Sequence, residues 1–449
     1  RAIETYKHKD VWKHLVVSGL REANSWIIPT KKYIELYKTT SKLRRARKKK
    51  NGECAHHKQI PDKTMKWINI LHLYQPPTQT KEIVDAVARE SYQKIVSLLA
   101  TYPNLRLTLN ISGSLLELLA RYGHQSIIKG FKSHAERGAV EFLGSAMYHP
   151  ILPLLSDGEI MRQIRLHDEI SRKYFGETYK PRGFFLPEMA YNQKTAAVLV
   201  SAGFEWVILD EIHVAEKINF GKKYNIAGVG LGTVFRDSFL SRTFPPEFIV
   251  ENMEKIKTEY VVTCHDGELY GHWHRDDWGY YKKAFTDNRI KMLTVSEYRA
   301  ELSGGEDIAV HDASWESKPE ELAENTAFGL WNDPRNKIHN MLETFKRKIL
   351  TLVESHQSSP GYETARHYAD RGVASCAWWW ASERKIGSFS PRSWNPTEIE
   401  KGARELYKAS SSLNLLPWES AEISSLFENL RQTIWKKHSR DYDPNYLIE

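Results

Sequence analysis

Residues 183–210 read "GFFLPEMAYNQKTAAVLVSAGFEWVILD" and hold a strand, a helix and a second strand in one run. The first apolar run ends at Pro187, because proline cannot donate to a sheet ladder. A helical stretch at 194–204 and a second apolar run at 205–210 follow. Units of this kind build parallel sheets, whose strand ends carry the functional residues. Glu188 stands at such an end, although a solvated loop carboxylate is the simpler interpretation.

Apolar runs of strand length recur on both sides of this unit, with amphipathic helical stretches such as 114–122 and 158–175 between them. The further runs are 67–73, 105–111, 140–146, 233–237, 260–266 and 290–295. Seven or eight strands alternating with helices favour a β/α barrel over an open sheet. We therefore predict an α/β fold with a catalytic barrel over residues 67–305.

Beyond residue 305 helical periodicity replaces the strand pattern. Amphipathic stretches occupy 336–356, 396–413 and 420–438. Apolar residues that recur every three or four positions indicate helices with one buried face. We predict an α-helical C-terminal domain over 306–449, packed on the barrel.

The composition of the 449 residues is that of a globular protein, with 41% hydrophobic and 12% aromatic residues. No apolar run approaches the roughly 18 residues that a membrane span needs, and no signal peptide opens the chain. Three cysteines form no spaced pair, so no disulfide framework is indicated. We expect a cytoplasmic protein without a membrane partner.

Positive charge is concentrated in a basic N-terminal extension, residues 1–66. It holds 18 Lys and Arg against 6 Asp and Glu, whereas the remainder holds 46 against 50. The charge peaks in "SKLRRARKKK" (41–50), a block typical of a solvated, partly disordered arm more often than of a nucleic-acid-binding tail. "CAHH" (54–57) has no second Cys/His pair after it, so no metal site is predicted.

Carboxylates, imidazoles and aromatic rings recur where the predicted strands stop. They are His72, Tyr74 and Gln75 after the first strand, Tyr148 and His149 after the third, Glu188, Arg236 with Asp237, and His265, Asp266, Glu268, His272, Trp273 and His274. Two carboxylates from different strands are what glycoside cleavage requires, one as nucleophile or base and one as acid. Aromatic rings suit the apolar faces of sugars. Singly, each feature is weak: His149 or "AWWWASE" (377–383) could serve packing alone.

Five motifs together resemble the conserved regions of family 57 glycoside hydrolases. They are "HLYQPP", "GSAMYHPILPLL", "GFFLPEMAY", "CHDGELYGHWH" and "ASCAWWWASERKIGSFSPRSW", in that order between residues 66 and 410. The resemblance implies an incomplete (β/α)7, TIM-like barrel followed by a helical domain. It also implies α-glucan substrates, retention of configuration through a covalent glycosyl-enzyme, and no cofactor.

Carried over by motif, Glu188 resembles the nucleophile and Asp266 the general acid/base. His72, His149, Trp273 and the tryptophans 378–380, with Trp379 as the main candidate, would bind substrate. Gln75 and Arg236 are further candidates for bonding sugar hydroxyls. The first motif departs from the family pattern, because Tyr74 replaces its second histidine and puts one bond to substrate in doubt.

The expected mechanism sets two conditions on the carboxyls. Retention calls for a separation of about 5–5.5 Å between them, and Asp266 must hold a proton at rest. Burial and the negative charge of Glu188 are both expected to raise the pKa of Asp266.

Other functions stay open on the sequence. An α-amylase acting on α-1,4 linkages, a 4-α-glucanotransferase and a branching enzyme would share this site. A metal-dependent deacetylase or α-mannosidase could use His265, Asp266, His272 and His274 as ligands. A binding protein could use the basic arm, although nothing after residue 66 is basic overall. Linkage preference and oligomeric state are not predicted.

Overall fold

The computed structural model describes residues 64–275, 278–385 and 392–442 of the chain. The predicted basic block 41–50 and the "CAHH" stretch lie outside these residues. Every predicted apolar run contains a strand. The strands are β1 (Met65–Leu73), β2 (Leu107–Ile111), β3 (Val140–Phe142), β4 (Gly183–Phe185), β5 (Trp206–Asp210), β6 (Tyr224–Ile226), β7 (Gly232–Arg236), β8 (Tyr260–Asp266), β9 (Ile290–Leu293) and β10 (Glu306–Ile308).

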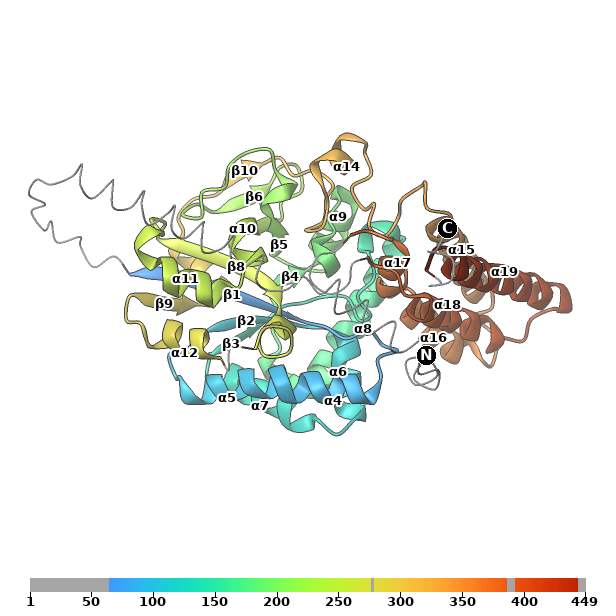
Figure 1. Ribbon diagram of the computed structural model, residues 1–449, viewed down its shortest axis with the longest axis horizontal. Helices are drawn as coiled ribbons and strands as arrows, with labels where there is room; N and C mark the ends of the chain where they lie inside the picture. Colours follow the sequence, from blue (N-terminus) through green and yellow to red (C-terminus); the bar gives the residue numbers. More distant parts are fainter. Residues whose placement is uncertain (1–63, 276–277, 386–391, 443–449) are drawn as a thin grey trace, which may run out of the picture. The chain divides into compact units, whose positions relative to one another are not determined.

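The strands form two sheets that join into one barrel. One sheet has the order β3-β2-β1-β8, with β9 also paired to β1, and the other has the order β10-β6-β7-β5-β4. A single bridge between Gly144 and Phe184 joins β3 to β4, and the amide of Asp237 donates to the carbonyl of Val262, 2.8 Å away. Because both junctions are this thin, the barrel of β1–β5, β7 and β8 is incomplete, as predicted (Figure 1).

Alternation along each strand sorts its side chains between the barrel interior and the surrounding helices. Ile68 and Ile70 of β1 lie in the interior cluster with Val262 and Cys264 of β8. Trp67 belongs to the outer cluster, where β1 meets the helices. Both faces are buried, which explains why these strands read as continuous apolar runs.

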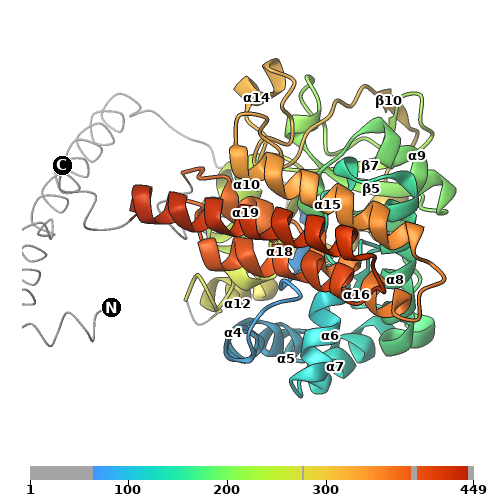
Figure 2. The same ribbon diagram turned by 90° about the vertical axis from the view of Figure 1, so that its right-hand side faces the viewer.

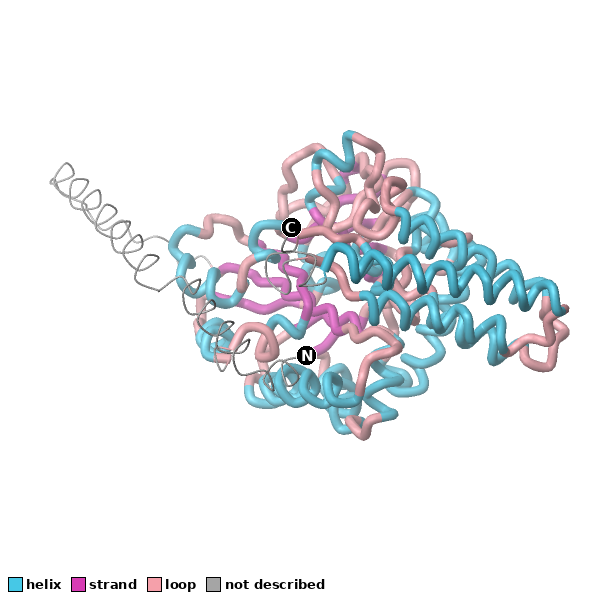
Figure 3. The backbone as a smooth tube through the Cα atoms, turned by 45° about the vertical axis from the view of Figure 1, so that its right-hand side comes forward, coloured by secondary structure: helices cyan, strands magenta, loops and turns pink. Residues whose placement is uncertain are grey.

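Helices surround the barrel strands (Figure 3). They are α4 (Lys81–Val87), α5 (Gln93–Thr101), α6 (Gly113–Arg121), α7 (Gln125–Glu136), α8 (Asp157–Phe175), α9 (Gln193–Ser201), α10 (Ser238–Arg242), α11 (Pro245–Asn252), α12 (Gly279–Thr286) and α13 (Val295–Glu301). Ser112 caps α6 by accepting a bond from the amide of Leu115, and this satisfies one of the free amides at the helix start.

A helical region follows the barrel and has its own core. It comprises α14 (Pro319–Ala323), α15 (Lys337–Ser355), α16 (Tyr362–Gly372), α17 (Cys376–Ala381), α18 (Pro396–Ser411) and α19 (Pro417–Tyr442). The predicted helices at 336–356, 396–413 and 420–438 are confirmed as α15, α18 and α19, which lie side by side in Figure 2. The sequence did not predict α16, because its buried face includes Arg366 and Asp370 instead of an apolar stripe.

Within the described residues, no helix combines the length and the apolar character that crossing a bilayer demands.

Candidate active site

Strand register gathers polar side chains into one layer at the carboxyl ends of the barrel strands. His72, Asp210, Arg236 and Asp266 each follow an interior apolar residue of the same strand by two positions. The register pairs His72 with both Asp266 and Asn110, and it pairs Asp210 with Arg236. Because alternate residues share a face, these five side chains form the uppermost layer of the barrel interior.

Glu188 enters this region on a strained turn after β4. The turn (Pro187–Met189) gives Glu188 a φ of 58° and Met189 a φ of 48°, the left-handed region that side chains rarely adopt. The amide of Trp315 donates to the carbonyl of Glu188 over 3.2 Å, and His213 Nε2 bonds the carbonyl of Met189 over 2.9 Å. Such strain persists where neighbours over-determine the backbone, and it clusters at functional sites.

The Glu188 carboxylate has one strong hydrogen bond and one nearby imidazole. Its Oε2 accepts a bond from Trp315 Nε1 at 2.8 Å, and its Oε1 lies 3.9 Å from His149 Nδ1. Burial and the charge of Asp266 raise the pKa of Glu188 to about 8, although the Trp315 bond opposes the rise. The effect of Asp266 on this pKa means that the two carboxyls interact electrostatically.

Asp266 is the last residue of β8 and is exposed to solvent. Loss of hydration beside the surrounding protein is the main cause that raises the pKa of Asp266 to about 6; the cation of Arg236 opposes the rise and the charge of Glu316 adds to it. The predicted rise in the pKa of Asp266 and its cause by burial agree with the structure, but the carboxylate charge that adds to the rise is that of Glu316 and not that of Glu188. The pKa of Glu188 is also raised, so the two carboxyls hold one proton between them around neutral pH.

Two neutral histidines lie between these carboxyls and the barrel core. His72 stacks on Phe185 and on His149, with ring centres 4.6 and 4.8 Å apart. Burial lowers the pKa of His72 to about 4 and that of His149 well below its usual value, so both rings are uncharged at neutral pH. His72 Nδ1 donates to Asn110 Oδ1 over 2.6 Å.

Two buried polar atoms of this layer have no protein partner. Within the described residues no group bonds His149 Nε2 or Asn110 Nδ2. Buried donors and acceptors are costly to leave unpaired, so both atoms are suited to bonding a ligand.

Arg236 and Gln75 direct their polar groups at the protein. Arg236 is buried, and its guanidinium bonds Asp210 and the carbonyl of Cys264, the latter at 2.7 Å. Gln75 Nε2 lies 3.5 Å from Glu268 Oε1. The sequence analysis proposed that both residues bond sugar hydroxyls. In the structure both also have protein partners, which the sequence analysis did not predict.

The predicted tryptophans differ in exposure. Trp273 follows Asp266 in the chain and is 55% exposed. Trp379 and Trp380 are half-buried on α17, whereas Trp378 packs inside the helical core. Tyr74, the departure from the family motif, stacks on His149 at 4.0 Å and bonds Cys376 of α17 at 3.1 Å, so it links the barrel to this helix.

A π-helix, η1 (Ala88–Tyr92), packs against the loop that follows Asp266. Ser91 donates to the carbonyl of Gly267 at 3.0 Å, and Tyr92 donates to Glu268. Position 271 requires a glycine because the backbone of Glu90 packs closely against it. The φ of Gly271 is +90°, and a Cβ there would lie 2.2 Å from the carbonyl oxygen of Glu90. Burial and the charge of Asp266 raise the pKa of Glu268 to about 8.

Comparison with known proteins gives the family of this chain. The sequence profile of glycosyl hydrolase family 57 matches residues 21–310. The chain belongs to this family. An alpha-amylase of Pyrococcus horikoshii is 27% identical over 310 residues, which are 64% of this family 57 chain and 47% of that protein.

Solved structures agree with the fold of the family 57 chain. The 4-alpha-glucanotransferase of Thermococcus litoralis has a TM-score of 0.62 at 19% identity, over 79% of this chain and 59% of that one. A GH57 branching enzyme of Thermococcus kodakaraensis has a TM-score of 0.60 at 14% identity, over 83% of this chain and 95% of that one. The chain spans about half or less of the length of the curated relatives it matches.

The histidines after β8 do not gather into a metal site in this family 57 chain. His265 Nε2 lies 2.9 Å from the Tyr270 hydroxyl, and His272 Nδ1 lies 2.7 Å from Glu90. The ring of His274 packs on Phe244, with centres 3.7 Å apart. In the part of the chain that the structure describes, no three His, Cys, Asp or Glu side chains converge on one point.

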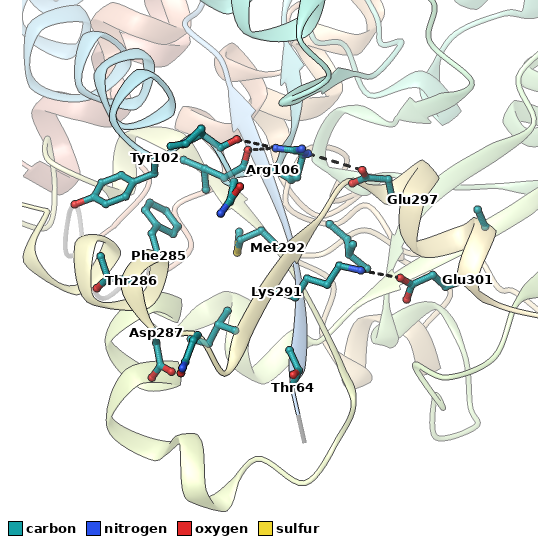
Figure 4. Close-up of a pocket in the computed structure, with 17 residues that line it drawn as sticks. Thr64, Tyr102, Arg106, Phe285, Thr286, Asp287, Lys291, Met292, Glu297 and Glu301 are labelled. Atoms are coloured by element: carbon teal, nitrogen blue, oxygen red, sulfur yellow. Dashed lines mark hydrogen bonds and ion pairs between the residues drawn. The ribbon is translucent and has the colours of Figure 1, made fainter. Parts of the chain in front are cut away.

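A separate hollow of about 930 Å³ lies at the other end of the family 57 barrel (Figure 4). Thr64 precedes β1 and Arg106 precedes β2, so this hollow opens at the amino ends of the strands. Four of its charged lining residues form two ion pairs: Arg106 with Glu297 at 3.8 Å, and Lys291 with Glu301 at 3.3 Å. It is therefore separate from Glu188 and Asp266, which lie at the carboxyl ends of the strands.

Sequence reasoning missed three residues of the family 57 site. Asn110 and Asp210 could have been found, because each continues the alternation of its strand. Trp315 could not: it lies outside all five motifs and is 127 residues from the carboxylate it bonds.

Proposed function

We propose that this chain is a retaining glycoside hydrolase of the α-amylase type, acting on α-1,4-glucan through Glu188 and Asp266. The observation that carries the proposal is that two carboxyls, Glu188 in the turn after β4 and Asp266 at the end of β8, lie beside the same histidines. Glu188 Oε1 lies 3.9 Å from His149 Nδ1, His149 stacks on His72, and Asp266 is the register partner of His72. Family membership and the alpha-amylase and 4-alpha-glucanotransferase names of its relatives support the substrate class.

In the first step Glu188 attacks the anomeric carbon of a bound glucan. The glycosidic C–O bond breaks, the proton of Asp266 passes to the departing oxygen, and a glycosyl-enzyme ester forms on Glu188. This requires the shared proton on Asp266 and an ionised Glu188. The two carboxyls titrate as a coupled pair, and the singly protonated form with the proton on Asp266 is the one that reacts.

In the second step Asp266, now ionised, accepts a proton from water. The water oxygen attacks the anomeric carbon, the ester bond to Glu188 breaks, and the sugar leaves with its original configuration. Both carboxyls return to their starting charges.

Substrate hydroxyls would bond His149 Nε2 and Asn110 Nδ2, two buried atoms beside His72 that have no partner among the described residues. Both side chains belong to the same polar group as His72, because His72 contacts each of them. The exposed ring of Trp273 is suited to stacking on a sugar further from the reacting bond.

A second candidate is 4-α-glucanotransferase activity. A sugar hydroxyl would replace water in the second step, with the same ester on Glu188. We retain this candidate because a solved 4-alpha-glucanotransferase, with a TM-score of 0.62, has the same fold as this chain.

The test is chromatography and NMR of maltoheptaose incubated with the enzyme and with Asp266→Asn. Shorter chains that first appear as the α-anomer, with a loss of about 1,000-fold or more in the variant, would support the proposal. Chains longer than the substrate would make the enzyme a transferase. A β-anomer would exclude retention, and no reaction by the wild-type protein would exclude α-1,4-glucan as substrate.

A further inference from the structure

Trp315 is fixed beside Glu188 by backbone and side-chain contacts. Tyr191 and Ala313 pair as a short antiparallel bridge, which aligns residues 313–315 along the turn of Glu188. The amide of Trp315 donates to the carbonyl of Glu188 at 3.2 Å, and Arg242 donates to the carbonyl of Trp315 at 2.6 Å. With both its backbone groups bonded, Trp315 has little freedom to move its ring.

The indole ring is held on its face and at its edge. The guanidinium of Arg236 lies 4.7 Å from the ring centre, and the ring meets Phe185 edge-on at 5.9 Å. Only 8% of Trp315 is exposed, so its N–H group reaches Glu188 Oε2 in a site largely shielded from water. A cation over an aromatic face is attractive, and it also polarises the N–H group toward its acceptor.

This N–H bond has opposite effects on the two chemical steps. Glu188 loses its negative charge when it attacks the sugar and regains that charge when the ester breaks. A donor aimed at Oε2 stabilises the charged carboxylate, so it favours departure of Glu188 in the second step. In the first step the same stabilisation slightly opposes attack, while the fixed geometry assists it.

We propose that Trp315 is a positioning residue that acts through Glu188, orienting the carboxylate for attack and stabilising it as the leaving group. The proposal rests on the proposed function, because it requires Glu188 to carry the sugar. It assigns a role in the reaction to Trp315, a residue outside all five sequence motifs. The guanidinium of Arg236 packs on the ring of Trp315.

The test is turnover of α-maltotriosyl fluoride, whose leaving group does not need the proton of Asp266. For Trp315→Phe we expect kcat to fall about 10- to 100-fold with a parallel fall in KM, so that kcat/KM changes by less than about threefold. Intact-mass measurement during turnover should show protein carrying one maltotriosyl group. Replacing Trp315 by β-(3-benzothienyl)alanine, which has sulfur in place of N–H, should reproduce the result with the shape of the ring retained.

The matched control is Trp331→Phe. Trp331 is 1% exposed in the helical core, and no described group bonds its N–H. This control removes the same atoms without touching Glu188, so kcat and KM should both stay near wild type.

Two results would overturn the role of Trp315. One is an equal fall of kcat and kcat/KM without any glycosyl-enzyme, and the other is wild-type kinetics in the benzothienyl variant. Failure of the proposed function looks different: the wild-type protein would not turn over the fluoride, or Glu188→Gln would keep its activity.

Discussion

Glu188 and Asp266 are two carboxyls whose surroundings raise their pKa values to about 8 and about 6. Burial is the main cause for both, and mutual repulsion adds to the higher value. Arg236 acts against these effects, because its cation lowers the pKa of each carboxyl. The pair therefore holds one proton around neutrality, which is the state that double displacement requires.

We expect kcat/KM to follow a bell-shaped pH profile with limbs near pH 6 and pH 8. Below about pH 6 both carboxyls are protonated and no nucleophile remains; above about pH 8 both are ionised and no acid remains. The measurement is kcat/KM for maltoheptaose from pH 4 to pH 10. A profile with a single limb would contradict a shared-proton pair.

Strands and turns set which residues can reach one another in this site. The period of two along β1, β5, β7 and β8 aims four polar side chains inward at the same height. The π-helix η1 then presents consecutive side chains to the loop after β8. Single-turn π-helices are frequent at functional sites. This one lies in the segment between β1 and β2, and it bonds the loop that follows Asp266.

Tyr92→Phe should loosen this attachment. The buried Glu268 would lose the hydroxyl that bonds it and keep only the long contact with Gln75, so its pKa should rise further. We expect the free energy of unfolding to fall by about 1–2 kcal/mol, and kcat to fall several-fold as Asp266 becomes less well placed. Urea unfolding and kcat for maltoheptaose measure the two effects.

Tyr280→Phe is the control for this change. The Tyr280 hydroxyl bonds Glu251 at 2.9 Å near the start of α12, and this bond is exposed. Stability should change by no more than about 0.5 kcal/mol. Equal losses in the two variants would argue against a special role for the π-helix.

The barrel and the helical region are joined by buried charge. Arg366 of α16 is wholly buried and bonds Glu159 of α8, Glu354 of α15 and Asp370 of its own helix. Arg162 of α8 bonds Asp370 as well, at 2.8 Å. Because His149 and Tyr74 contact Ser375 and Cys376, this junction also supports the active site.

Arg366→Met should destabilise the protein by about 3–5 kcal/mol, because it leaves buried carboxylates without their cation. Arg172→Met is the control, since Arg172 pairs with Asp168 on the exposed face of α8 and should cost about 0–1 kcal/mol. The urea midpoint of each variant measures the difference. If Arg366→Met unfolded at the wild-type midpoint, the charge network would not hold the two regions together.

Local sequence features predicted much of this molecule. Strand runs such as 67–73 and 260–266 were identified from continuous apolar residues, because a barrel strand buries both faces. The strand ends offered several carboxylates, and the resemblance to the family motifs singled out Glu188 and Asp266 among them. In contrast, β6 ("YNI") and β10 ("EDI") were not predicted, because neither belongs to a continuous apolar run.

The sequence by itself determined where the barrel strands and the long helices of the C-terminal region lie, and which polar residues stand near the strand ends. Those properties depend on neighbours within a few positions, so they can be read locally. Only the tertiary structure decided that Trp315 meets Glu188, that η1 holds the loop of Asp266, and that Glu188 has the higher pKa. These features depend on groups far apart in the chain, on the water they exclude and on the charges they bring together, and no local periodicity encodes them.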